Sequence, residues 1–275
     1  MFQVAAYENA VEIQTLDELR ALKSSPDRHK LGFQSMLIRE RVLGKQNVET
    51  SSIIRHNTVL YADEERFDKA VQLLFHIFEN LSDVDPFKDH DQIDDYGYLL
   101  TYLLNGEDID GPGATTFSHA LKSLQWALSD FERGEAQHRQ KSKPEAVLTR
   151  RYNLLKIILH MICLLRQTEE QATLRERKEL SEASKTFIKT GALSHRGETL
   201  LHMACDADTS NFHSGEENPF TSFVFPALEV VQALLDAGCD VNARNDKGQT
   251  ALAVAREQEG DHSEIISILM AAGAG

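Results

Sequence analysis

Apolar residues recur every three or four positions along most of the chain, which is the spacing of one face of an α-helix. In the run FDKAVQLLFHIFENL at residues 67–81, this spacing places Ala70, Leu74 and Ile77 on one face. Runs of this kind cover residues 35–44, 50–64, 67–81, 117–134, 148–167 and 169–188. No run of alternating apolar and polar positions, the mark of a half-buried strand, interrupts them. The pattern predicts an all-α fold.

The helices at 50–64 and 67–81 are short and close together, as in a helical hairpin. Phe67 precedes Ala70 by three positions, and tetratricopeptide-type repeats combine an aromatic ring with a small residue in this way. The turn glycine that is usual between such helices is absent, because Glu64 and Glu65 stand there. We therefore predict a tetratricopeptide-like hairpin stack at residues 35–81 and keep an ordinary helical hairpin as the alternative.

The middle of the chain contains loops and one unusually apolar helix. Residues 82–95 and 105–116 are rich in Asp, Gly and Pro, which predicts loops on both sides of a short apolar piece at 96–104. The helix at 148–167 is apolar around most of its circumference, so we expect it to be buried on several sides.

The last 80 or so residues follow a different pattern. GETLLHMAC at 197–205 matches the G-x-T-P-L-H-x-A opening of an ankyrin repeat, with Leu200 in place of Pro. LEVVQALLDAGCDVNARNDKG at 228–248 matches the second helix and the return loop of such a repeat, and GQTALAVAR at 248–256 opens another. Thr199 is suited to capping the first helix, and Gly238 to ending the second in a left-handed conformation. Two ankyrin repeats are predicted.

The first of these repeats carries an insert. The two opening glycines, Gly197 and Gly248, lie 51 positions apart, whereas the repeat period is about 33 residues. The extra residues fall within 206–226, which we predict to be a mobile loop that leaves the stack and contacts a partner. An equally weighted alternative is that the loop folds its aromatic rings back onto the stack. The candidate partner-binding residues are His213, Glu216, Glu217 and Phe223.

Two ankyrin repeats do not bury enough surface to be stable alone, since about three are needed. They are expected to lean on the preceding helices, or the sequence is a piece of a longer protein. Ile265, Ile268 and Met270 are among the apolar residues that spread around the last helix, so part of it is expected to be exposed. Such a patch favours association of copies into a homo-oligomer.

Composition and charge exclude several classes of partner. The chain has 275 residues and a formal net charge of −14, and no basic cluster points to nucleic acid or to anionic lipid. Three scattered cysteines and an acidic N-terminus without an apolar core indicate a reducing compartment and no signal peptide. We expect the protein in the cytoplasm, with the nucleus as an alternative, and proteins as its partners.

Candidate sites for chemistry are few, and none is convincing. Asp83 to Asp94 have near calcium-loop spacing, but the turn glycine and the final Glu of such a loop are absent. His160 and Cys163 share the face of an apolar helix, where core residues are far more common than ligands. His202 belongs to the ankyrin phrase, in which it has a structural role. We therefore predict no catalytic, cofactor-binding or metal site, and a protein that is not an enzyme.

The combination of these phrases resembles the Fem (feminization) family. SMLIRERVLG at 35–44 and the LYADE turn at 60–64 resemble its tetratricopeptide segment. TLLHMACDADTSNF at 199–212 and FPALEVVQALLDAGCDVNA at 225–243 resemble its C-terminal ankyrin repeats in the same order. Asn57, Thr58 and Val59 stand where the family usually has an Arg-Gly-Ala phrase, and Ala253 replaces the second ankyrin His.

The resemblance implies a substrate receptor of a cullin-RING ubiquitin ligase. In that family an N-terminal ankyrin array captures degrons and a C-terminal box docks elongin and cullin. This sequence resembles the part between them, so we expect that the chain alone binds neither a degron nor elongin. The alternative is a stand-alone helical adaptor with no ubiquitin role. The predicted layout is an α-solenoid with a helical part at 1–81, a second with acidic loops at 82–190, and two ankyrin repeats at 191–275.

Overall fold

A computed structural model describes residues 5–80, 91–105, 116–137, 145–211 and 223–275 of the chain. Within these ranges every regular element is helical and no strand occurs, so the prediction of an all-α fold is confirmed. None of the described helices is long and apolar enough to cross a membrane. The chain divides into two compact units, residues 1–84 with 105–109 and residues 85–104 with 110–275.

The first unit is built from helices that pack in chain order. Its elements are η1 (Ala5–Tyr7), α1 (Leu16–Ser24), α2 (Arg28–Leu43), α3 (Val48–Ala62) and α4 (Phe67–Asn80). Helix α3 packs against both α2 and α4, as successive helices do in an α-solenoid. The three helices expected from residue 35 onward are present, although α2 begins seven residues earlier, at Arg28.

The turn between α3 and α4 forms without a glycine. Glu65 takes a positive φ of 60°, the conformation that glycine adopts most easily. The amide of Arg66 then donates a hydrogen bond to the carbonyl of Tyr61 at 2.9 Å, which closes the turn. Ala70 is buried, as expected of the small residue, whereas the ring of Phe67 is only partly buried. The buried ring at this hairpin is that of Tyr61.

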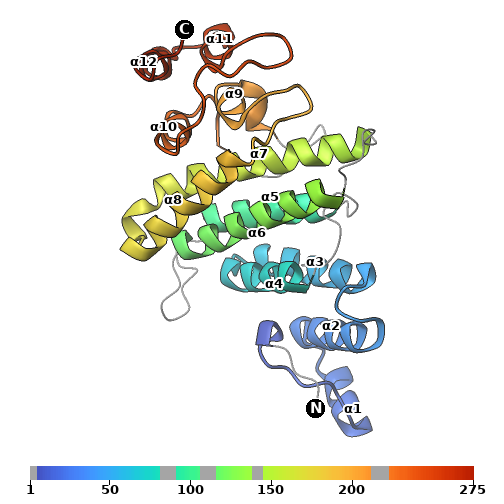
Figure 1. Cartoon of the computed structure of the whole chain (residues 1–275). Helices are drawn as coiled ribbons and strands as arrows, with labels where there is room; N and C mark the ends of the chain where they lie inside the picture. The colour runs from blue at the N-terminus through green and yellow to red at the C-terminus, as the bar shows by residue number, and fades with distance from the viewer. Residues whose placement is uncertain (1–4, 81–90, 106–115, 138–144, 212–222) are drawn as a thin grey trace. The chain divides into compact units, whose positions relative to one another are not determined.

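The second unit contains the remaining helices, shown in green to red in Figure 1. They are α5 (Asp91–Asn105), α6 (Thr116–Gln137), α7 (Glu145–Gln167), η2 (Glu169–Gln171), α8 (Leu174–Lys189), α9 (Leu200–Ala204), η3 (Ala207–Ser210), α10 (Leu228–Asp236), α11 (Ala251–Glu257) and α12 (Ser263–Ala271). Helix α5 corrects the expected loop before residue 96, because it begins at Asp91 inside the acidic stretch.

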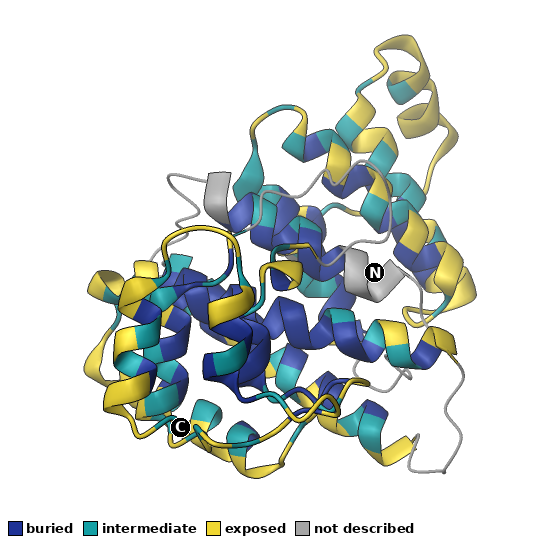
Figure 2. Ribbon diagram, turned by 90° about the horizontal axis from the view of Figure 1, so that it is seen from above, coloured by how far each residue is buried: buried dark blue, intermediate teal, exposed yellow. Residues whose placement is uncertain are grey.

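Helix α7 is the centre of the second unit. It packs along α6 on one side and contacts the ankyrin helices α9 and α10 on another (Figure 1). Its residues from Leu154 to Leu165 are all buried, which confirms the expectation from their apolar pattern. Buried positions, dark blue in Figure 2, lie on the facing sides of neighbouring helices, while turns and outer faces are teal or yellow.

Candidate partner-binding site on the ankyrin pair

The opening phrase of the first ankyrin repeat forms a hydrogen-bonded start for α9. The hydroxyl of Thr199 accepts a bond from the amide of His202, which caps the helix. The amide of Thr199 donates in return to Nδ1 of His202 at 3.3 Å. Since Nδ1 accepts, Nε2 carries the proton, and it donates to the carbonyl of Gln249 in the next repeat at 2.9 Å. The predicted structural role of His202 is confirmed.

A second link joins the turns of the two repeats. Gly197 has a φ of 68°, and a Cβ atom there would lie 3.0 Å from the backbone nitrogen of Asp246. The amide of Asp246 donates to the carbonyl of Arg196 at 3.1 Å. Glycine at 197 therefore serves two purposes, because it allows the left-handed conformation and the close approach of the next turn.

The insert between α9 and α10 is anchored at both of its described ends. At the first end, the hydroxyl of Thr209 in η3 donates to the carbonyl of Met203 at 2.5 Å, and Thr209 is fully buried. At the second end, the amide of Phe225 donates to the hydroxyl of Ser210 at 2.8 Å. Phe225 is also buried, with 2% of its surface exposed. The two ends of the insert therefore lie together against the helices.

Two side chains of α7 hold this base. The Lys156 ammonium donates to the carbonyl of Asp208 and, at 2.5 Å, to the carbonyl of Asn211. The His160 Nε2 atom lies 2.9 Å from the carbonyl of Thr209, and its Nδ1 accepts the amide of Phe223 at 3.2 Å. We call Lys156 and His160 the α7 clamp. It joins both described ends of the insert to a buried helix.

The electrostatics of the clamp follow from its burial. Burial lowers the pKa of His160 to about 4, outweighing the Thr209 carbonyl, which favours the charged ring. His160 is therefore neutral at pH 7, as its hydrogen bonds require, with a donor at Nε2 and an acceptor at Nδ1. Burial also lowers the pKa of Lys156, against the opposing effect of Asp208. The side-chain nitrogens of Lys156 and His160 all bond to the insert backbone. The α7 clamp is therefore a structural anchor.

Of the four predicted partner-binding residues, Phe223 lies in the described part of the chain. His213, Glu216 and Glu217 lie outside the described residues. Phe223 is partly exposed, and its ring centre lies 6.0 Å from that of His160. Its neighbour Val224 is 81% exposed. At its described ends the insert agrees with the alternative of a loop folded back on the stack, whereas mobility of residues 212–222 stays a prediction.

The two possible ligands on the helix at 148–167 lie in the core. His160 and Cys163 are both buried in α7. Burial raises the pKa of the thiols of Cys163 and Cys205 to about 12, which makes both poor nucleophiles. No group of three metal-binding side chains gathers within the described ranges. The calcium-like stretch from Asp83 to Asp94 lies outside the described side chains.

The fold and the contacts of the ankyrin pair define the class of protein to which the C-terminal part belongs. Helical hairpins, a capped Thr199–His202 opening and a hydrogen-bonded link between successive turns make the C-terminal part an ankyrin-repeat structure, and the ankyrin repeat family matches residues 196–246. Proteins of this class are repeat-based adaptors that bind other proteins.

Comparison with curated proteins gives the family. The chain is 29% identical over 274 residues to protein fem-1 homolog C of Danio rerio, and 30% identical over 278 residues to protein fem-1 homolog A of Bos taurus. Protein fem-1 homolog A of Homo sapiens is also 30% identical, over 277 residues. The predicted resemblance to the Fem family is therefore confirmed along almost the whole chain. Each alignment covers 98% of this chain but only 42%, 40% and 39% of these relatives.

Proposed function

We propose that the chain is a scaffold in the substrate-recognition part of a cullin-RING ubiquitin ligase, acting in protein ubiquitination and proteasomal degradation. The observation that carries this proposal is the similarity to fem-1 homologues along 98% of the chain, because the Fem family resemblance implies that role. The ankyrin pair supports a role in binding proteins. In this role the α7 clamp holds the two described ends of the insert, at residues 208–211 and at Phe223, beside the ankyrin pair.

The test is affinity capture of the tagged full chain from cells, combined with measured half-lives of the proteins that co-purify with it. Depletion of the chain should lengthen the half-life of a bound protein. The tagged chain alone is expected to capture neither elongin nor cullin, because the family resemblance assigns their docking to a box that this sequence does not match. Proteasome inhibition should then remove the difference between depleted and control cells. A second chain has the insert residues His213, Glu216, Glu217 and Phe223 replaced by Ala. It tests whether these residues contact the partner, because in that case the variant should lose the bound proteins.

A different result would favour the stand-alone adaptor. If proteins co-purify but their half-lives do not change on depletion, the ligase role is wrong while the adaptor role stands. Imaging of the same tagged chain would test the predicted location in the cytoplasm, or alternatively the nucleus. Sedimentation of the purified chain would test the predicted association of copies.

A further inference from the structure

Residues 7–13 form a strap that crosses the helices of the first unit. The strap has the sequence YENAVEI and begins at Tyr7 in η1, which packs on α4. It ends shortly before Thr15, the residue that caps α1. Tyr7 is fully buried, whereas every other residue of the strap is at least partly exposed. The strap therefore lies on the helices as a bound peptide lies on a receptor, with one buried anchor.

The anchor ends on a buried carboxylate. The Tyr7 hydroxyl donates to Oε2 of Glu40 at 2.5 Å, and Nε2 of His76 lies 3.0 Å from the same oxygen. The Glu40 side chain is only 7% exposed. Burial alone would raise the pKa of Glu40, but the bonds from His76 and Tyr7 outweigh burial and lower it, so the carboxyl is charged at pH 7. Because His76 stays beside Glu40 when Tyr7 leaves, the site is a preformed acceptor for a phenolic hydroxyl.

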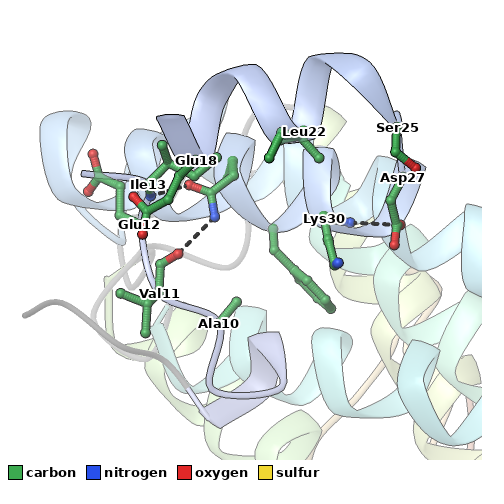
Figure 3. Close-up of a pocket in the computed structure, with 12 residues that line it drawn as sticks. Ala10, Val11, Glu12, Ile13, Glu18, Leu22, Ser25, Asp27 and Lys30 are labelled. Carbon is green, nitrogen blue, oxygen red and sulfur yellow. Dashed lines mark hydrogen bonds between the residues drawn. The ribbon is translucent and has the colours of Figure 1, made fainter. Parts of the chain in front are cut away.

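One side chain of α2 binds the backbone of the strap. The Gln34 side-chain oxygen accepts a bond from the amide of Ile13 at 2.7 Å, and its nitrogen donates to the carbonyl of Val11 at 2.9 Å (Figure 3). These bonds go to backbone groups, so they form with any sequence that is extended at this point. Gln34 therefore recognises the path of the chain, and other side chains must recognise its sequence.

Basic side chains hold the two glutamates of the strap. Arg41 of α2 binds Glu12 through two nitrogens, at 2.7 and 2.8 Å. Arg66 and Lys69, at the start of α4, lie 3.3 and 3.5 Å from Glu8. An acidic strap thus lies on a locally basic surface. All three basic side chains are partly exposed, so each ion pair contributes little and a competing carboxylate can take its place.

Two features favour release of the strap. Glu8 and Asn9 have positive φ values of 53° and 56°, a conformation that residues other than glycine adopt less readily. The strap also borders a groove of about 520 Å³ that is lined by residues 10–13, by α1 and by α2 (Figure 3). Release would relax the turn at Glu8 and Asn9, and the groove gives the strap room to move without shifting a helix.

We propose that the strap is an internal ligand on a peptide-binding surface, and that a partner protein binds this surface by replacing the strap with a segment of the same chemistry. That segment has a tyrosine, a glutamate one position later and a second glutamate five positions later, as in YENAVE. Its tyrosine hydroxyl bonds to Glu40, its second glutamate pairs with Arg41 and its backbone bonds to Gln34. While the strap is seated, it blocks the surface. The proposal does not depend on a role in ubiquitination.

The test is fluorescence anisotropy with the full chain and a labelled peptide, AAYENAVEI, which copies residues 5–13. The receptors are the wild type and Tyr7→Ala, in which the strap has lost its anchor. We expect the peptide to bind Tyr7→Ala at least about tenfold more tightly than the wild type, a difference of about 1.4 kcal/mol. Val11→Ala is the matched control in the strap and should bind as the wild type does, because it removes an exposed side chain and keeps the backbone bonds to Gln34.

Altered peptides and a second receptor variant locate the contacts. In the Tyr7→Ala chain, a peptide with Phe in place of Tyr should bind at least about tenfold more weakly, because Glu40 then receives no hydroxyl. A peptide with Lys in place of both Glu residues should not bind, and binding of the original peptide should weaken as salt is raised. Adding Gln34→Ala and Arg41→Ala to the Tyr7→Ala chain should also weaken binding of the original peptide.

The fold of each variant is checked by circular dichroism, because Tyr7→Ala removes a buried ring. Glu8→Ala with Glu12→Ala removes only partly exposed side chains, so this variant should keep its helix content and still bind the peptide more tightly than the wild type. If neither opened variant binds the peptide more tightly than the wild type, the proposal is wrong. It is equally wrong if Tyr7→Ala loses helix content that the peptide does not restore, because the strap is then part of the core. A wild-type dimer that the free peptide dissociates in analytical ultracentrifugation would assign the surface to the strap of a second copy instead of a partner.

Discussion

Protonation of His160 should loosen the second unit as the pH falls. Its ring is fully buried and makes one bond as a donor and one as an acceptor, to the two described ends of the insert. Adding a proton to Nδ1 converts the acceptor into a second donor, which opposes the amide of Phe223 and places a positive charge in an apolar site.

The size of the effect follows from the change in pKa. Burial lowers the pKa of His160 from 6.5 to about 4, so the unfolded chain binds a proton before the folded chain does. The stabilising contribution of the neutral ring is therefore complete above pH 6.5 and is lost as the pH falls toward 4. At about 1.4 kcal/mol for each pH unit, the free energy of unfolding should fall by about 3 kcal/mol across this range.

The assay is urea denaturation at a series of pH values, followed by the fluorescence of Trp126. This residue is the single tryptophan of the chain and lies in α6, within the same unit as His160. The informative variant is His160→Gln, because a glutamine amide retains a donor for the carbonyl of Thr209 and does not titrate. Its stability should depend less steeply on pH than that of the wild type, by about 3 kcal/mol between pH 6.5 and 4.

Comparing the pH dependence of stability in the wild type and in His160→Gln also cancels the contributions of other titrating groups. The pKa of Asp206 is raised by burial, so it contributes in the opposite direction, but it does so in both chains. His56→Gln is a control for the histidine-to-glutamine replacement itself, at an exposed position of the first unit. If the wild type and His160→Gln lose stability in parallel as the pH falls, the assignment of the neutral His160 ring as the anchor is wrong.

Two further substitutions test close approaches at glycines. Gly197→Ala should lower the free energy of unfolding by about 2–3 kcal/mol in thermal denaturation, because it combines a strained φ of 68° with a clash against Asp246. The control Gly238→Ala has a positive φ but open space around the new Cβ, and it should lower the free energy of unfolding by about 1 kcal/mol. Equal losses in the two variants would show that the clash with Asp246 does not matter. Gly32→Ala should destabilise the first unit by about 1–3 kcal/mol, since the new Cβ would lie 3.1 Å from Cγ of Asn57 and closer still to its amide oxygen. Adding Asn57→Ala should recover part of that loss in the same measurement, and a purely additive double variant would contradict the packing argument.

The sequence predicted the regular parts of this fold because their causes are local. Helical periodicity located α3 and α4, and the full apolar circumference of α7 correctly indicated a helix buried on several sides. The ankyrin phrase predicted the cap at Thr199 and the structural role of His202, since both depend on positions within one repeat. The acidic start of α5 was not predicted, because Asp-rich sequence favours loops unless tertiary packing overrides it.

The sequence could not predict how the insert is anchored, because the contacts that hold it are distant in sequence. Lys156 contacts backbone carbonyls that lie 52 and 55 positions away, and His160 contacts one that lies 49 positions away. A backbone carbonyl has no sequence signature, so nothing in the insert indicates its partner. The available signal was that Lys156 and His160 interrupt the apolar run at 154–165, since polar side chains in a buried run must find partners.

The same helix explains how two ankyrin repeats can be stable in this chain. A repeat buries its apolar face only against a neighbour, and two repeats alone leave one such face uncovered. Helix α7 contacts both α9 and α10, and its apolar circumference allows it to face α6 and the repeats at once. It therefore takes the place of a preceding repeat for the ankyrin pair. Because the α7 clamp also holds the insert, a substitution that disturbs α7 should affect the repeats and the insert together, whereas one at the tip of the insert should leave the repeats unchanged.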